Sequence, residues 1–119
     1  MQEIRIMIVD DHQIFRTGLR RPLELEEDFN IIAEVADGES AIEKALELQP
    51  DIILMDIHLP IINGLQATRQ IKAKLPDAGV IVLTAYHDDE QLLHALRAGA
   101  AGYYPKDVDP GTLIGCIRE

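Results

Sequence analysis

The chain has 119 residues, of which 47% are apolar, and its aromatic residues are two phenylalanines and three tyrosines. A chain of this length forms one domain with a core of its own, and the composition predicts a core of aliphatic side chains. Twenty-one acidic and eleven basic residues give a formal net charge of -10, which excludes binding of nucleic acid backbones or anionic membranes by this segment itself.

Five short apolar runs alternate with five helix-like patterns along the chain. The runs are continuous rather than alternating, which is typical of parallel strands that are covered on both faces. The sequence therefore predicts an α/β fold, in which helices cover both faces of a parallel sheet. The expected strands span residues 4–9, 31–35, 51–55, 80–84 and 101–104.

The helices expected between these strands carry apolar residues at helical spacing. The predicted core-facing stripes are Phe15, Leu19 and Leu23, then Ala41, Ile42, Ala45 and Leu46, and then Leu92, Leu93 and Leu96. A further helix is expected over residues 64–74. Asp109 followed by Pro110 is a typical helix start, and we expect that last helix to be cut short at Glu119.

Two features near the end of the first helical pattern call for separate predictions. Pro22 lacks a backbone N–H, so we expect the helix to kink or end early there. The acidic residues Glu24, Glu26, Glu27 and Asp28 are predicted to form a solvated helix end.

Secreted and membrane proteins are not indicated. The one cysteine, Cys116, cannot form an internal disulfide, and the first residues do not resemble a signal peptide. The apolar runs fall far short of the roughly 20 residues of a membrane span. We therefore expect a cytoplasmic protein without membrane contact.

Polar side chains follow four of the predicted strands. Asp10 and Asp11 follow the first, Asp56 the third, Thr84 the fourth and Lys106 the fifth. Open α/β sheets bind ligands at the carboxyl ends of their strands. We therefore expect these five side chains to form a single site.

Three carboxylates and one ammonium leave a formal charge of about -2, which a divalent cation would offset. Oxygen ligands favour Mg²⁺. Asp56, a lone carboxylate, is predicted to be a nucleophile toward phosphorus, whereas the adjacent Asp10 and Asp11 suit a metal ion. Thr84 and Lys106 can contact phosphoryl oxygens. Any one aspartate could be a turn residue, but the combination favours a site.

The motifs around these residues resemble those of a response-regulator receiver domain of two-component systems, and the resemblance covers essentially the whole chain. The matching segments are Ile8-Val9-Asp10-Asp11-His12, Met55-Asp56-Ile57-His58-Leu59-Pro60, Asn63-Gly64, Val82-Leu83-Thr84-Ala85 and Gly102-Tyr103-Tyr104-Pro105-Lys106.

This resemblance implies a flavodoxin-like (βα)5 fold with strand order 2-1-3-4-5. It also implies a sensor histidine kinase as donor and Asp56 as phosphoacceptor, capable at most of slow self-dephosphorylation rather than acting as an enzyme. The implied Mg²⁺ ligands are Asp11, Asp56 and the backbone carbonyl of His58, with Asp10 acting mostly through water. Thr84 and Tyr103 match the switch positions.

Residues 11–20 and the pair Lys106-Asp107 further resemble receivers of regulators with a LuxR/NarL/FixJ-type helix-turn-helix. Residues 1–119 would then be the receiver domain, and a DNA-binding domain outside this chain would regulate transcription. A homodimer could form on phosphorylation. The chain departs from many receivers in one respect, since its proline, Pro105, precedes the lysine instead of following it.

Two alternatives stay open at this point. One is an aspartyl-phosphate phosphohydrolase, although the haloacid dehalogenase type has a DxD pattern where this chain has adjacent Asp10 and Asp11. The other is a protein-binding scaffold that works without phosphorylation. Within the receiver interpretation, His58 and Tyr86 each follow a site residue by two positions and are predicted to tune the lifetime of the phosphoryl group.

Overall fold

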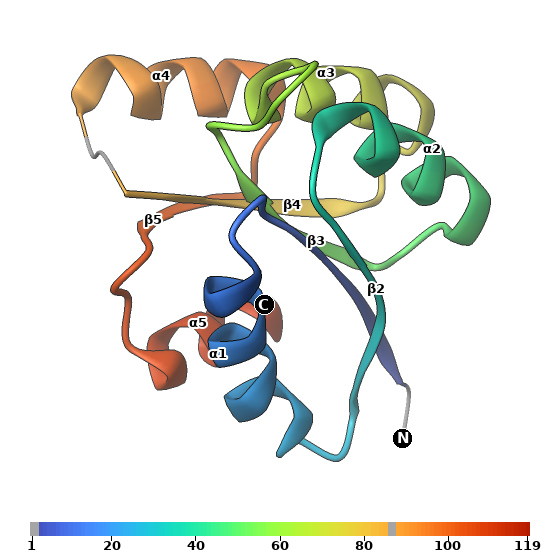
Figure 1. The fold of residues 1–119 in the computed structure, drawn as a ribbon, viewed down its shortest axis with the longest axis vertical. Helices are drawn as coiled ribbons and strands as arrows, with labels where there is room; N and C mark the ends of the chain where they lie inside the picture. The colour runs from blue at the N-terminus through green and yellow to red at the C-terminus, as the bar shows by residue number, and fades with distance from the viewer. Residues whose placement is uncertain (1–2, 86–87) are drawn as a thin grey trace.

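The computed structural model describes residues 3–85 and 88–119, in which strands and helices alternate (Figure 1). The strands are β1 (Ile4–Val9), β2 (Phe29–Val35), β3 (Ile52–Asp56), β4 (Gly79–Thr84) and β5 (Gly102–Pro105). The helices are α1 (Gln13–Glu24), α2 (Gly38–Leu48), α3 (Gly64–Lys74), α4 (Asp89–Ala98) and α5 (Pro110–Ile117). Among the described residues, no helix has the length and apolar character needed to cross a membrane.

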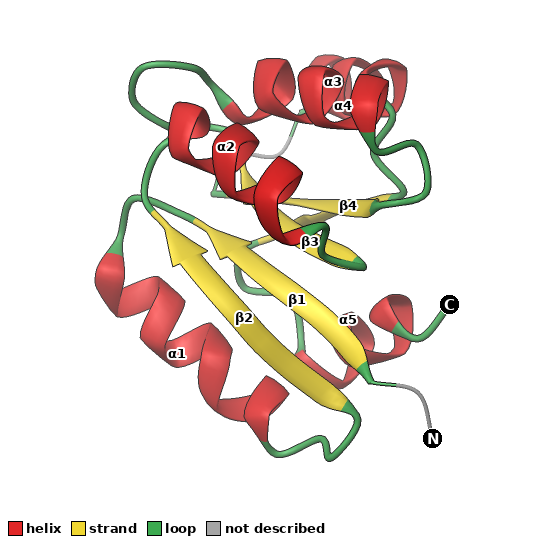
Figure 2. Ribbon diagram, turned by 90° about the vertical axis from the view of Figure 1, so that its right-hand side faces the viewer, coloured by secondary structure: helices red, strands yellow, loops and turns green. Residues whose placement is uncertain are grey.

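All neighbouring strands are parallel, and their order is β2-β1-β3-β4-β5, which confirms the predicted topology. Helices α1 and α5 cover one face of the sheet, and α2, α3 and α4 cover the other (Figures 1 and 2). The chain order reverses between β1 and β3, so the connections from these two strands diverge to opposite faces, which is the point where open α/β sheets bind ligands.

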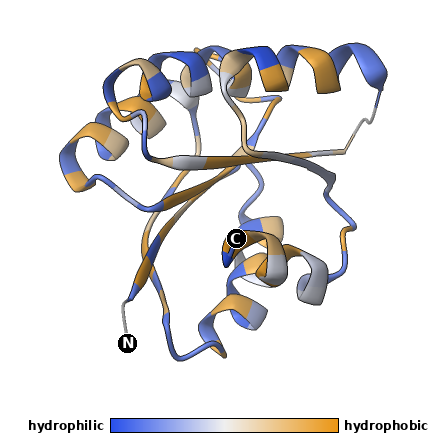
Figure 3. Cartoon of the chain, turned by 180° about the vertical axis from the view of Figure 1, so that it is seen from behind, coloured by the Kyte–Doolittle hydropathy of each residue, from blue (hydrophilic) through white to orange (hydrophobic). Residues whose placement is uncertain are grey.

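The core consists of two apolar layers, one on each face of the sheet. In β1, Met7 and Val9 pack toward α2 and α3, whereas Ile6 and Ile8 pack toward α1 and α5. All four are at most 1% exposed. Successive side chains of a strand point to opposite faces, so a strand buried on both must be continuously apolar, as the orange central strands of Figure 3 illustrate.

The predicted core-facing stripe of α4 is wrong. Leu93 and Leu96 are 46% and 52% exposed, and the helix instead buries Ala95 and Ala98. Both sets have helical spacing, so periodicity alone could not distinguish them; the alanines allow close packing against the sheet and α3. In the same way Leu46 of α2 is partly exposed, although Ala41 and Ala45 of its predicted stripe are fully buried.

Helix α1 does not end at Pro22 but continues to Glu24. The proline lies so close to the end of the helix that the backbone hydrogen bond lost at its nitrogen does not stop the last turn. The acidic segment that follows is not simply solvated, because Arg118 Nη2 lies 2.7 Å from Glu26 Oε1 and 2.8 Å from Asp28 Oδ1. This ion pair lowers the pKa of Asp28.

The connection from β3 to α3 is built tightly against the end of β3. Gly64 donates its backbone N–H to the Ile57 carbonyl at 2.8 Å, and Asn63 caps α3 by accepting a hydrogen bond from the Gln66 N–H. A Cβ atom at residue 64 would lie only 1.8 Å from the Asp56 carbonyl oxygen. Only glycine therefore fits beside this backbone.

We predict that Gly64→Ala lowers the free energy of unfolding by about 1–3 kcal/mol, because the backbone around Asp56 must shift to admit the methyl group. Gly18→Ala is the matched control, since nothing lies within 4 Å of the added Cβ within α1. That change should stabilise the protein by roughly 0.5–1 kcal/mol. Urea denaturation measures both, and equal effects of the two changes would contradict the proposed crowding.

Candidate functional site

The carboxyl ends of four strands bring the predicted polar residues together. Asp10 follows β1, Asp56 ends β3, Thr84 ends β4 and Lys106 follows β5. The Lys106 ammonium lies 2.7 Å from Asp10 Oδ2 and 3.3 Å from Asp56 Oδ2. One lysine therefore bridges two carboxylates that come from adjacent strands.

A backbone hydrogen bond after β5 and an aromatic ring from α1 both hold Lys106 in place. Its N–H donates to the Thr84 carbonyl at 2.8 Å, which extends the pairing of β4 with β5 past Pro105. Pro105 lacks an N–H, but β5 is an edge strand, where proline is tolerated. The ammonium also lies 4.6 Å from the centroid of the Phe15 ring, a cation–π contact that α1 contributes.

The two bridged carboxylates are buried, with Asp10 1% and Asp56 3% exposed. Burial raises the pKa of Asp56, and the charge of Asp10 raises it further, while Lys106 and the backbone N–H of His58 oppose the shift. Burial lowers the pKa of Lys106, but its hydrogen bond to Asp10 and the charge of Asp56 more than offset this, so the pKa is raised overall. The site holds more negative charge than its lysine neutralises.

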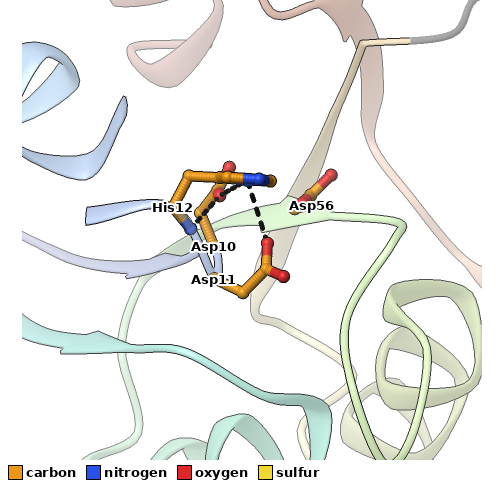
Figure 4. A group of neighbouring side chains, drawn as sticks. All are labelled: Asp10, Asp11, His12 and Asp56. Atoms are coloured by element: carbon orange, nitrogen blue, oxygen red, sulfur yellow. Dashed lines mark hydrogen bonds and ion pairs between the residues drawn. The ribbon is translucent and has the colours of Figure 1, made fainter. Parts of the chain in front are cut away.

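The turn after β1 adds residues that the sequence did not single out. The backbone N–H of His12 donates to Asp10 Oδ1 at 2.8 Å. The His12 ring Nδ1 lies 3.2 Å from Asp10 Oδ1 and 3.0 Å from Asp11 Oδ1 (Figure 4). Arg16 of α1 donates to the Asp10 carbonyl and to Glu34 of β2. The position of His12 directly after the acidic pair was the available signal.

This donor set fits a divalent cation. Asp10, Asp11, His12 and Asp56 each offer one ligand atom, and these atoms all lie within 4.8 Å of one another. Three of the four residues offer carboxylate oxygens, which Mg²⁺ prefers. Two of them are buried beside a single lysine, so an additional positive charge would be favourable there.

Of the remaining predicted residues, His58 follows β3 and Tyr103 belongs to β5. His58 has an exposed side chain, and its backbone N–H donates a hydrogen bond to Asp56. Tyr103 packs against the apolar layer beneath α3, and its hydroxyl is already buried. Burial raises the pKa of this hydroxyl, and a hydrogen bond from the Asp88 backbone opposes the shift. Tyr86 lies outside the described residues, and His94 is exposed on α4.

We predict that Asp56→Asn stabilises the protein by about 1 kcal/mol at neutral pH without divalent ions, because it removes a buried charge. A raised pKa in the folded state means that stability falls as pH rises from the ordinary value of 3.8 through the folded value. The gain should therefore disappear below pH 3.8, where the parent carboxyl is protonated in both states. Urea denaturation with EDTA across this range measures it.

The matched control is Asp11→Asn, since the Asp11 side chain is 35% exposed. Its effect should stay within about 0.5 kcal/mol at every pH. If the difference in the free energy of unfolding between Asp56→Asn and the parent did not depend on pH, the destabilisation could not be assigned to the ionised form of Asp56.

Comparisons with known proteins agree with this geometry. The family model of the response regulator receiver domain matches residues 6–118. The transcriptional regulatory protein DegU of Brevibacillus brevis is 42% identical over 116 residues, which cover 98% of this chain and 49% of DegU. The chain spans about half the length of the curated relatives it matches.

Solved structures show the same similarity. A LuxR-family two-component response regulator from Aurantimonas sp. is 38% identical, with a TM-score of 0.92 over 98% of this chain and 84% of that one. A chain of the CheX-CheY-BeF3-Mg²⁺ complex from Borrelia burgdorferi is 27% identical, with a TM-score of 0.90 over 98% of this chain and 87% of that one. Family model, relatives and fold agree that this chain belongs to the response regulator receiver domains of two-component systems.

Proposed function

We propose that Asp56 accepts a phosphoryl group from a sensor histidine kinase in a Mg²⁺-dependent reaction and that this modification switches the domain. The observation that carries the proposal is the arrangement of Asp56, buried at the carboxyl end of β3, between Lys106 and the acidic turn of Asp10 and Asp11. The names of the relatives favour transcriptional regulation as the output and give no support to a phosphohydrolase.

In this reaction a carboxylate oxygen of Asp56 forms a bond to phosphorus as the bond from phosphorus to the histidine nitrogen of the donor breaks. The transferred group adds negative charge beside carboxylates that already repel one another. Mg²⁺, held by Asp11, Asp56 and the His58 carbonyl with Asp10 acting through water, would supply positive charge to the phosphoryl oxygens. One of the similar solved structures is a complex that contains Mg²⁺.

Lys106 and Thr84 supply the protein's own contacts to the phosphoryl group. The Lys106 ammonium already touches Asp56, so it needs little movement to pair with a new phosphoryl oxygen. Thr84 is fully buried at the end of β4, the neighbour of β3, and its hydroxyl can donate to another oxygen. We also propose that the exposed side chain of His58, two residues after Asp56, influences water access and so the lifetime of the modification.

We further propose that the switch acts on transcription through a DNA-binding domain beyond residues 1–119, with a homodimer forming on phosphorylation. The net charge of -10 argues against DNA contact by this domain itself. The relatives named as transcriptional regulators are about twice as long as this chain, which leaves room for such a domain.

We predict that incubation with a small phosphodonor and Mg²⁺ adds the mass of one phosphoryl group, as measured on the intact protein. Asp56→Asn should abolish the addition, because the nucleophile is removed, and chelation should strongly reduce it. Asp51→Asn, at an exposed carboxylate just before β3, is the control that should leave labelling unchanged. Stoichiometric labelling of Asp56→Asn would rule out the assignment.

We also predict that the Thr84→Ala variant still accepts the phosphoryl group on Asp56. The conformational change that follows should, however, reach α4 and β5 only weakly. A doubly charged group is a stronger hydrogen-bond acceptor than a carboxylate and can draw a hydroxyl toward it. Because Tyr103 already has a buried hydroxyl, the change is expected in the backbone of β4, α4 and β5. Hydrogen exchange with and without phosphodonor measures it.

Thr84→Ser keeps the hydroxyl and is the matched control, which should respond as the parent does. If Thr84→Ala is phosphorylated to the same extent and shows the full exchange response, the signal travels through a different contact.

A further inference from the structure

The His12 side chain faces the acidic site rather than serving the helix that it precedes. It occupies the N-cap position of α1, yet no side-chain cap hydrogen bond forms there. Its ring Nδ1 instead contacts both Asp10 and Asp11 (Figure 4). The ring therefore contributes a nitrogen to a group of carboxylates that already fits a divalent cation.

We propose that His12 is a nitrogen ligand that lets this site bind borderline transition-metal ions such as Ni²⁺ and Cu²⁺, in addition to Mg²⁺. The inference rests on the cation site of the proposed function and adds a residue that determines metal specificity. Imidazole nitrogen suits ions such as Ni²⁺ and Zn²⁺, whereas Mg²⁺ selects oxygen. His12 should thus alter affinity for one class of ion and not for the other.

The distances in the cluster suit shared coordination. With metal–ligand bonds of about 2.1 Å, two ligands at a right angle on one ion lie about 3.0 Å apart, and two opposite ligands about 4.2 Å apart. The His12 nitrogen lies 3.2 Å and 3.0 Å from its two carboxylate oxygens. All four candidate ligand atoms, including that of Asp56, lie within 4.8 Å of one another, so small side-chain movements would complete the set.

The His12 ring can also leave its carboxylate partners for a metal ion at little cost in free energy. The His12 side chain is 70% exposed, and an exposed contact of this kind contributes little stability. Releasing the ring from the carboxylates therefore opposes metal binding only weakly. The turn itself stays ordered, because the His12 N–H remains bonded to Asp10 and Arg16 holds the Asp10 carbonyl.

The test is isothermal titration of the 119-residue chain with Ni²⁺ alone and with Mg²⁺ alone, at one mildly alkaline pH. His12→Gln should weaken Ni²⁺ binding at least tenfold, which corresponds to about 1.4 kcal/mol, and should change Mg²⁺ binding less than twofold. His94→Gln removes an exposed histidine of α4, outside the cation site, and should leave Ni²⁺ affinity unchanged.

A spectroscopic measurement reports the ligand directly. With Cu²⁺ in the site, electron spin echo envelope modulation should show coupling to an imidazole nitrogen in the parent and lose it in His12→Gln. Unchanged Ni²⁺ affinity in His12→Gln, or modulation lost only in His58→Gln, would overturn the role of His12. The Asp11→Asn variant distinguishes the role of His12 from the cation site itself, because it should weaken the binding of both Ni²⁺ and Mg²⁺. Failure of the parent protein to bind Mg²⁺ would contradict the cation site instead.

Discussion

The bridge from Lys106 to Asp10 and Asp56 is the interaction on which the site depends. Two carboxylates buried at the ends of adjacent strands repel each other, and this repulsion opposes folding unless a cation lies between them. The lysine reaches both from β5, two strands away from β3 in the sheet. The parallel order of the strands is thus what allows a residue near the end of the chain to stabilise residues near its start.

The same bridge leaves the site incompletely neutralised. Lys106 supplies one positive charge, while the raised pKa of Asp56 reflects burial and the nearby Asp10. A structure that only minimised its electrostatic cost would place an apolar residue at one of these positions. Because the excess charge is retained, a cation or phosphoryl group that binds at the site would change the electrostatic balance that Lys106 alone maintains.

Much of the fold could be predicted from sequence because strands buried on both faces must be apolar throughout. The end of each such run then marked the sheet edge where Asp10, Asp56 and Lys106 meet. The exposed leucines of α4 could not be predicted, since the alanine row has the same period and close packing decides between them. No contact was predicted for His12, because only its position after Asp10 and Asp11 pointed to one, and the orientation of its ring depends on the turn geometry.

The contact of Arg118 with Glu26 and Asp28 has a consequence for the edge of the sheet that β2 forms. It fastens the last turn of α5 to the connection between α1 and β2, and the Arg118 guanidinium also lies 5.0 Å from the Phe29 ring. These ion pairs are partly exposed, so dissolved salt screens them. A higher ionic strength should therefore weaken the attachment of α5 to this connection. The buried charges at the ends of β1 and β3 should be affected much less by salt.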